Sequence, residues 1–373
     1  MSRSSPAPAD RTPVDVAAPA ARAPARIAIA PASSLHNRFI NRFAASIAAG
    51  GFEVVDFAWN PLQLVQARIA ILHWPNEFFA TSSALSRSKA ALKLQMLRTA
   101  RRMRGLQLVW VAHNVRPHDS EPRSPALAQR FLDLIDGVIY LSQHSRSAIR
   151  ALYRLPATTL ELITAHGHYC DEYVTPAPPA LRPTRQVRLV HFGQVRPYKN
   201  VDELVLCASR LAHRGIHLTV AGLRQDEALA DRIAQLASKA RNVRLDLRGE
   251  PLAEAELEAT IDAGHAVVLP YREILNSGAA LYALSRNRPV LAPRLGGLPE
   301  LQHNAGADWV HLYDGPLTSA VLEEFADWMR HRARRGSPDL SAYDWKLIGE
   351  NTCQFIDRLR DQRGARSRQR LTQ

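Results

Sequence analysis

Two segments in the second half of the chain carry residue types that could bind a diphosphate. Residues 191–199 read HFGQVRPYK and residues 276–279 read NSGA, each after an apolar run. A helix start leaves about four backbone N–H groups without partners and carries a partial positive charge, and glycine lets an anion approach the backbone. Arg196 and Lys199 would add full charges. Each feature alone also fits an ordinary turn, but together they predict a diphosphate site.

The elements that must position these segments alternate along the whole chain. We predict strands at 26–30, 53–57, 68–73, 107–113 and 137–142, then at 187–192, 218–222, 243–247, 267–270 and 290–292, with helices between them that include 37–49 and 126–135. Continuous apolar strands separated by helices indicate parallel sheets covered on both faces. The expected fold class is therefore α/β, with two Rossmann-like, doubly wound domains facing each other across a cleft.

The length of 373 residues also favours two domains. Composition divides the chain into a disordered tail (1–25), a first domain (26–173), a Pro-rich linker (174–186), a second domain (187–340), a final helix (341–362) and a basic tail (363–373). The first 25 residues are rich in Ala, Pro and Arg and lack the apolar segment of a signal peptide.

Both phosphate segments resemble motifs of GT-B glycosyltransferases of the GT4 type. Residues 193–200 resemble the G-R-x-x-x-x-K-G turn of this family, residues 276–292 its E-x7-E region, and GGLPE at 296–300 the GGxxE sequence that closes the same site. The dipeptide at 344–345 resembles the start of a C-terminal helix that crosses back to the first domain. FGQxRPYK together with NSGAALYALS is most similar to bacterial exopolysaccharide enzymes, particularly β-mannosyltransferases that use GDP-mannose.

This resemblance implies a nucleotide-sugar site in the second domain. Its donor-binding residues would be Gly193, Arg196, Lys199, Tyr271, Glu273, Asn276, Ser277, Gly278, Ala279, Tyr282 and Glu300. The chain departs from the family where Gln194 replaces an Arg and where Ile274 and Tyr282 replace the two Glu. A carboxylate binds two vicinal ribose hydroxyls, whereas a phenol offers one donor and one acceptor. The identity of the donor and the choice between retention and inversion therefore stay open.

Candidate catalytic residues follow the predicted strand at 107–113. His113 is similar to the strand-end histidine that lies beside the transferred sugar in the family. An inverting reaction needs a base to remove the acceptor hydroxyl proton, and positive charge to stabilise the leaving diphosphate. We predict the base among His118, Asp119 and Glu121, although these residues could equally cap a loop or lie on the surface.

The formal net charge of +13 is concentrated in part on one predicted helix between Leu85 and Arg104. Basic residues that include Arg98, Arg101 and Arg102 alternate there with Leu85, Leu92, Met96, Leu97 and Met103. Such a helix indicates an acceptor-binding or membrane-surface face, or else an ordinary helix packed on the sheet. Nucleic acid would also select Lys and Arg, but no nucleic-acid-binding motif accompanies the charge.

Several other classes of site are not indicated. The three cysteines are widely spaced, and the group of His166, His168 and Cys170 lacks a fourth ligand, so we predict no metal and no disulfide framework. No G-x-G-x-x-G follows the first strand, which argues against a nicotinamide cofactor. No apolar run reaches the length of about twenty residues that spans a bilayer.

We therefore expect a cytoplasmic hexosyltransferase that needs no cofactor and associates with the inner face of the cytoplasmic membrane. It would transfer mannose from GDP-mannose onto a polyprenyl-diphosphate-linked oligosaccharide in exopolysaccharide biosynthesis. Its partners would be a nucleotide sugar, a lipid-linked acceptor and an anionic membrane surface, without nucleic acid. Two alternatives remain: a retaining GT4-type enzyme that uses a UDP-sugar, and a catalytically silent protein that binds a nucleotide sugar or a polyanion.

Overall fold

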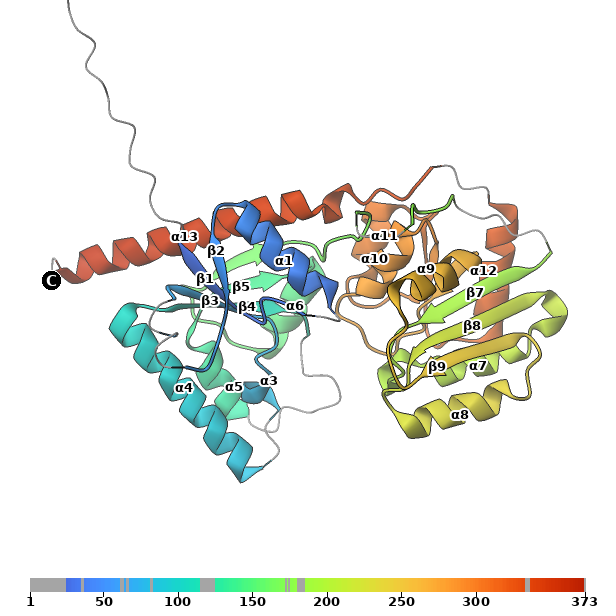
Figure 1. The fold of residues 1–373 in the computed structure, drawn as a ribbon, viewed down its shortest axis with the longest axis horizontal. Helices are drawn as coiled ribbons and strands as arrows, with labels where there is room; N and C mark the ends of the chain where they lie inside the picture. Colours follow the sequence, from blue (N-terminus) through green and yellow to red (C-terminus); the bar gives the residue numbers. More distant parts are fainter. Residues whose placement is uncertain are drawn as a thin grey trace, which may run out of the picture.

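The computed structural model describes residues 25–34, 37–60, 64, 67–80, 83–114, 125–171, 173, 175–179, 185–332 and 336–371. Two six-stranded parallel sheets, one in each half of the chain, form its framework (Figure 1). This arrangement confirms the predicted α/β class with two doubly wound domains.

The first sheet has the strand order β2-β1-β3-β4-β5-β6. Its strands are β1 (Arg26–Ala30), β2 (Glu53–Asp56), β3 (Ile69–Leu72), β4 (Gln107–Ala112), β5 (Ile135–Tyr140) and β6 (Leu160–Ile163). Its helices are α1 (Arg38–Ala49), α3 (Asn76–Phe79), α4 (Ala84–Arg104), α5 (Pro125–Leu132) and α6 (Gln143–Leu152). β3, β4 and β5 are almost fully buried, as expected of strands covered on both faces.

Local sequence explains how α1 covers this sheet. The side chain of Asn37 accepts a hydrogen bond from Phe39 N and so caps the helix start. Phe39, Phe43 and Ile47 recur at helical spacing and are all buried. Their rings and side chains pack in one cluster with Ile29 and Ile71 of the sheet and with residues of the final helix.

The second sheet has the strand order β12-β11-β10-β7-β8-β9. Its strands are β7 (Val187–Phe192), β8 (Ile216–Leu223), β9 (Val243–Arg248), β10 (Ala266–Val268), β11 (Val290–Pro293) and β12 (Val310–Tyr313). Its helices are η1 (Pro197–Lys199), α7 (Val201–Ser209), η2 (Ala212–Arg214), α8 (Glu227–Ala237), α9 (Glu254–Ala263), α10 (Gly278–Ser285), α11 (Leu298–Ala305) and α12 (Ser319–His331).

The chain passes between the two domains twice, in the segment after β6 and in the segment before α13. These two crossing segments are hydrogen-bonded to each other. After η3 (Ser341–Tyr343), helix α13 (Trp345–Leu371) runs back across the first sheet and packs on α1 (Figure 1). Trp345 Nε1 donates to His168 O at 2.7 Å, and His168 N donates to Tyr343 O at 2.9 Å. A Cβ added at Gly167 would lie 2.1 Å from the Trp345 ring, so this close approach needs a glycine.

The structure differs from the sequence prediction at several elements. The strands β6 and β12 were missed, because both are four-residue edge strands whose sequences lack a long apolar run. The helix expected at 126–135 ends at Leu132, and Ile135 already begins β5. The final helix starts at Trp345 rather than 341 and continues to Leu371, through residues predicted to form a separate basic tail.

Candidate functional site

Gly193 and Lys199 lie together at the carboxyl end of β7. Gly193 has a φ of +115°, and a Cβ added there would lie 2.7 Å from Lys199 Nζ. Any other residue at this position would therefore strain the backbone and displace the ammonium group. Arg196 belongs to the same turn, and its Nε donates to Gln194 Oε1 at 3.0 Å. Three residues of the predicted phosphate segment are thus brought into one turn.

The environment of Lys199 is unusual for a lysine. Burial and, to a smaller extent, the positive charge of Arg196 together lower its pKa to about 8. In the part of the chain that the structure describes, Lys199 forms no ion pair with a carboxylate. Removing a cation from water without a counter-ion among the described residues is unfavourable, and such perturbed groups concentrate at binding sites.

The start of α7, which follows this turn, does not extend the anion site. Asp202 and Glu203 occupy its first turn, and Asp202 is buried. These carboxylates already complement the helix dipole and would repel a phosphate. We expected two helix starts in the site, but the basic turn contributes its lysine and its glycine rather than a helix dipole.

The start of α10 lies at the next strand, since β10 pairs with β7 in the sheet. The side chain of Ser277 accepts from Ala280 N at 3.1 Å and caps this helix. Arg272 N donates to Tyr198 O at 2.8 Å, which joins the two loops that follow β7 and β10. The hydroxyl of Tyr271 lies 3.4 Å from Ser277 Oγ. The predicted phosphate segments are therefore neighbours at the carboxyl edge of the second sheet.

Two of the predicted donor-binding residues form hydrogen bonds with the first domain. Asn276 Nδ2 donates to Ser145 Oγ at 2.9 Å, and Glu300 Oε2 accepts from Gln143 N at 2.9 Å. A Cβ added at Gly278 would lie 3.1 Å from the imidazole of His166. The start of α10 thus lies where the two domains meet.

The other predicted donor residues have different surroundings. Tyr282 is buried among aromatic rings, with its centroid 5.8 Å from that of Phe192 and 5.3 Å from that of Tyr169. Ala279 is half-buried at the helix start, whereas Glu273 is exposed in the loop before it. The ring of Tyr282 packs where the family pattern has its second carboxylate.

A cluster of histidines faces this region from the first domain. His73 and His113 follow β3 and β4, and His73 Nδ1 lies 2.8 Å from His113 Nε2. Trp74 stacks on His113 with centroids 4.5 Å apart, and the centroid of Phe39 lies 4.6 Å from that of His166. Burial lowers the pKa of His73 to about 3 and that of His166 to about 4, so both rings are neutral near pH 7.

Sequence reasoning predicted His113 of this cluster as a site residue, and it considered His73 as a possible lining residue of the acceptor pocket but favoured a helix-capping turn there. The signal for His73 was present, because it directly follows an apolar strand in the same way as His113. His166 has no such signal, since it comes to the cluster from the segment after β6. The predicted bases His118, Asp119 and Glu121 lie outside the described residues.

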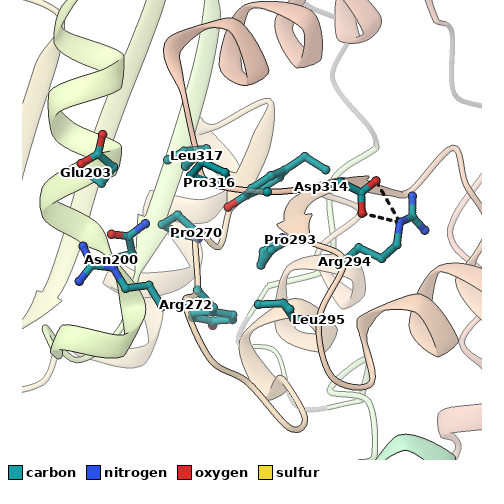
Figure 2. Close-up of a pocket in the computed structure, with 13 residues that line it drawn as sticks. Asn200, Glu203, Pro270, Arg272, Pro293, Arg294, Leu295, Asp314, Pro316 and Leu317 are labelled. Carbon is teal, nitrogen blue, oxygen red and sulfur yellow. Dashed lines mark hydrogen bonds and ion pairs between the residues drawn. The ribbon is translucent and has the colours of Figure 1, made fainter.

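A cavity of about 520 Å³ lies at the carboxyl ends of β10, β11 and β12 (Figure 2). Asn200 and Glu203 of the α7 start border it, as do Arg272 and Arg294, and Arg294 pairs with Asp314. Tyr271 lines this cavity and also contacts the cap of α10. The cavity is therefore adjacent to the α10 start.

The arginines of α4 lie far from this site along the sheet. Arg98, Arg101 and Arg102 border a second cavity of about 650 Å³ together with Gln107, at the amino end of β4, whereas His113 follows its carboxyl end. Arg101 forms a bidentate ion pair with the buried Asp136, which gives it a structural role. These arginines do not line the region between the domains.

The apolar residues of α4 that were predicted to form a single face lie partly in the core and partly on the surface. Leu97 is buried against the sheet with Ala90, Leu94 and Ala100. Leu85, Leu92 and Met103 are instead 64–68% exposed. Their spacing of seven and eleven residues places them on one stripe of the helix, turned away from the core.

Among the described residues, no group of three or more His, Cys, Asp or Glu side chains is arranged to hold a metal ion. No helix within the described ranges is both long and apolar enough to cross a bilayer.

Comparison with known proteins identifies relatives of this arrangement. Residues 186–327 match the family of glycosyl transferases group 1. The chain is 29% identical over 299 residues to a GDP-mannose:glycolipid 4-beta-D-mannosyltransferase of Xanthomonas campestris pv. campestris, which covers 79% of this chain and 80% of the relative.

Solved structures share the fold at low sequence identity. The sucrose-phosphate synthase of Thermosynechococcus elongatus superposes with a TM-score of 0.62 at 14% identity, over 90% of this chain and 99% of that one. Anabaena HepE in complex with UDP superposes with a TM-score of 0.60 at 14% identity, over 90% and 100% of the two chains. The two-domain fold implied by the resemblance to GT-B glycosyltransferases is thereby confirmed.

Proposed function

We propose that this hexosyltransferase transfers mannose from GDP-mannose to a lipid-linked oligosaccharide. The proposal is supported by the match of residues 186–327 to the group 1 glycosyl transferases and by the two-domain fold of the GT-B type. The observation that carries the donor site is the half-buried Lys199, whose ammonium group lies over Gly193 without a carboxylate partner among the described residues. A donor diphosphate supplies the missing negative charge.

In the proposed complex, Lys199 and Arg196 bind the diphosphate from the turn after β7. The N–H groups at the start of α10, at Gly278 and Ala279, stabilise it from the neighbouring strand. The same cations then stabilise the negative charge that develops on the leaving nucleotide. This role requires no metal ion, since two side-chain cations and a helix start already provide positive charge.

GDP-mannose is the proposed donor because of the mannosyltransferase relative, whose name also specifies a glycolipid acceptor. We extend that acceptor class to a polyprenyl-diphosphate-linked oligosaccharide in exopolysaccharide biosynthesis. Such an acceptor would bring the protein to the inner face of the cytoplasmic membrane.

The exposed stripe of Leu85, Leu92 and Met103 on α4 supports a membrane-facing surface. Arg98 and Arg102 lie on the same helix, and within the described ranges neither is paired with a buried carboxylate as Arg101 is. Apolar side chains that insert between lipid headgroups, combined with basic residues that attract anionic lipids, are typical of helices that lie in a membrane surface.

Transfer assays with a panel of sugar nucleotides test the proposed function. GDP-mannose should raise the melting temperature and should yield a mannosylated product with a lipid-linked oligosaccharide as acceptor. Transfer from a UDP-sugar but not from GDP-mannose would support the alternative donor. Binding of nucleotide sugars without turnover of any of them would support the catalytically silent alternative.

A further inference from the structure

Among the described residues, the pair formed by His73 and His113 leaves one ring nitrogen available to a ligand. His73 Nδ1 and His113 Nε2 are joined at 2.8 Å, and His73 is 1% exposed. His73 Nε2 is buried and has no hydrogen-bond partner within the described part of the chain. His113 is half-buried, and its Nδ1 forms no hydrogen bond with a described residue. The pair can therefore offer only His113 Nδ1 to a bound molecule.

Both rings are neutral near pH 7. Burial lowers the pKa of His73 to about 3. Burial also lowers the pKa of His113 well below its ordinary value, with smaller contributions from His73 and His166. A neutral imidazole carries one N–H and one lone pair, so two protons are distributed over the four nitrogens of the pair.

These protons can be arranged in two ways. In the first, His73 Nδ1–H donates to His113 Nε2, and the buried His73 Nε2 retains only an unused lone pair. In the second, His113 Nε2–H donates to His73 Nδ1, and His73 Nε2 carries a buried N–H without an acceptor. An orphaned buried N–H is rarer in proteins than an unused acceptor, and the edge contacts of His73 with Phe39 and Phe43 provide at most a weak acceptor.

We propose that His73 is a positioning residue that fixes His113 in the tautomer with its proton on Nδ1, so that His113 presents a hydrogen-bond donor and not a base. Trp74, stacked 25° from the plane of His113, and Phe39, edge-on at 5.0 Å, fix the orientation of the ring. The use of this donor rests on the proposed function: His113 Nδ1–H donates to an oxygen of the bound sugar nucleotide or acceptor. The base that removes the acceptor hydroxyl proton is then a different group.

The tautomer can be measured without any substrate. Proton–nitrogen correlation spectra of the histidine rings in the full-length, nitrogen-15-labelled protein distinguish protonated from unprotonated nitrogens, and a His113→Gln variant assigns the signals. We expect a protonated Nδ1 and an unprotonated Nε2 at His113. A protonated Nε2 on His113 in the wild-type protein overturns the proposal.

Variants of His73 test whether this residue sets the tautomer. His73→Asn keeps an N–H donor near the position of Nδ1 and should leave the His113 signals unchanged. His73→Asp offers only an acceptor and should move the His113 proton to Nε2. If the Asp variant does not fold, His73→Leu, which removes the hydrogen bond, should give a mixture of both tautomers. An unchanged single tautomer in His73→Leu also overturns the proposal.

Kinetics then separate positioning from folding. In transfer from GDP-mannose, His73→Leu should lower kcat about tenfold with little change in KM, and His73→Asn should restore most of the rate. A loss in both variants alike contradicts the positioning role. If the wild-type protein transfers no sugar, the proposed function fails, whereas the tautomer measurement still decides the role of His73.

Discussion

At the scale of single residues, Lys199 connects sequence chemistry to the proposed donor site. Its ammonium group lies over Gly193, where any Cβ would collide with it, and burial lowers its pKa to about 8. The neighbouring His191 stays neutral, because burial and the charge of Lys199 lower its pKa to about 3. Among the described residues Lys199 forms no ion pair with a carboxylate, so its charge is available to a bound anion.

Replacing this cation should weaken nucleotide binding. We expect Lys199→Met to reduce GDP affinity by about 1.5–3 kcal/mol, because a charged hydrogen bond to the diphosphate is lost. Isothermal titration calorimetry measures the change, and Lys239→Met, at an exposed lysine of the same domain, is the matched control. Equal affinities of the wild-type and Lys199→Met proteins would remove Lys199 from the site.

The lowered pKa also predicts a pH dependence. Only the ammonium form attracts the diphosphate, so affinity should be highest below about pH 8 and should fall as the pH rises through the pKa of Lys199. An ordinary lysine would keep its charge to about pH 10. Calorimetry between about pH 7 and pH 9.5 tests this, and Lys199→Arg should remove the dependence because guanidinium stays protonated. A flat profile in the wild-type protein would contradict the assignment.

At the scale of elements, α4 has two faces with different tasks. Ala90, Leu94 and Leu97 pack on the first sheet, whereas Leu85 and Met103 belong to the exposed stripe on the opposite side. In the proposed function this exposed apolar stripe, on a helix that also carries arginines, is the surface that would meet lipid.

Polar substitution of this stripe should release the protein from vesicles. The triple variant with Leu85, Leu92 and Met103 changed to Ser should bind anionic vesicles about tenfold more weakly or worse, because the inserted apolar area is lost. Sedimentation with vesicles measures the bound fraction. Leu152→Ser, at an exposed leucine of α6, is the control and should bind as the wild type does. Equal sedimentation of the triple variant would refute the membrane role of α4.

At the scale of the whole molecule, the two segments that cross between the domains are hydrogen-bonded to each other. His168 receives a hydrogen bond from Trp345 and donates one to Tyr343, so the segment after β6 and the segment before α13 are held together. Asn276 and Glu300 add contacts between the domains near the start of α10. Rigid packing at the crossings would keep the histidine cluster and the start of α10 aligned.

Adding a side-chain atom where Gly167 packs against Trp345 should destabilise the protein. Gly167→Ala places a Cβ against the Trp345 ring, and overpacking of this kind costs about 1–3 kcal/mol, so the melting temperature should fall. Differential scanning fluorimetry measures the shift. Gly364→Ala in α13, where an added Cβ meets nothing within 4 Å, should leave the melting temperature unchanged or raise it. A Gly167→Ala protein as stable as the wild type would show that the junction can relax.

Much of the framework could be predicted from local patterns. The apolar runs that became β1 and β7 were predicted with their observed bounds, and Asn37 marked the start of α1. These features depend on residues close in sequence, so they can be predicted without knowledge of the fold. The edge strands β6 and β12 could not be predicted in this way, because their short sequences become strands only by pairing with a neighbouring strand of the sheet.

The sequence by itself determined that two α/β domains carry a basic, glycine-containing turn and a second helix start at strand ends, because apolar periodicity and residue type are local properties. Only the tertiary structure decided that Asp202 is buried at the α7 start and that Arg101 pairs with Asp136. It also brought His73 against His113. Burial, pKa and tautomer depend on what distant segments place around a side chain, and that is set by packing.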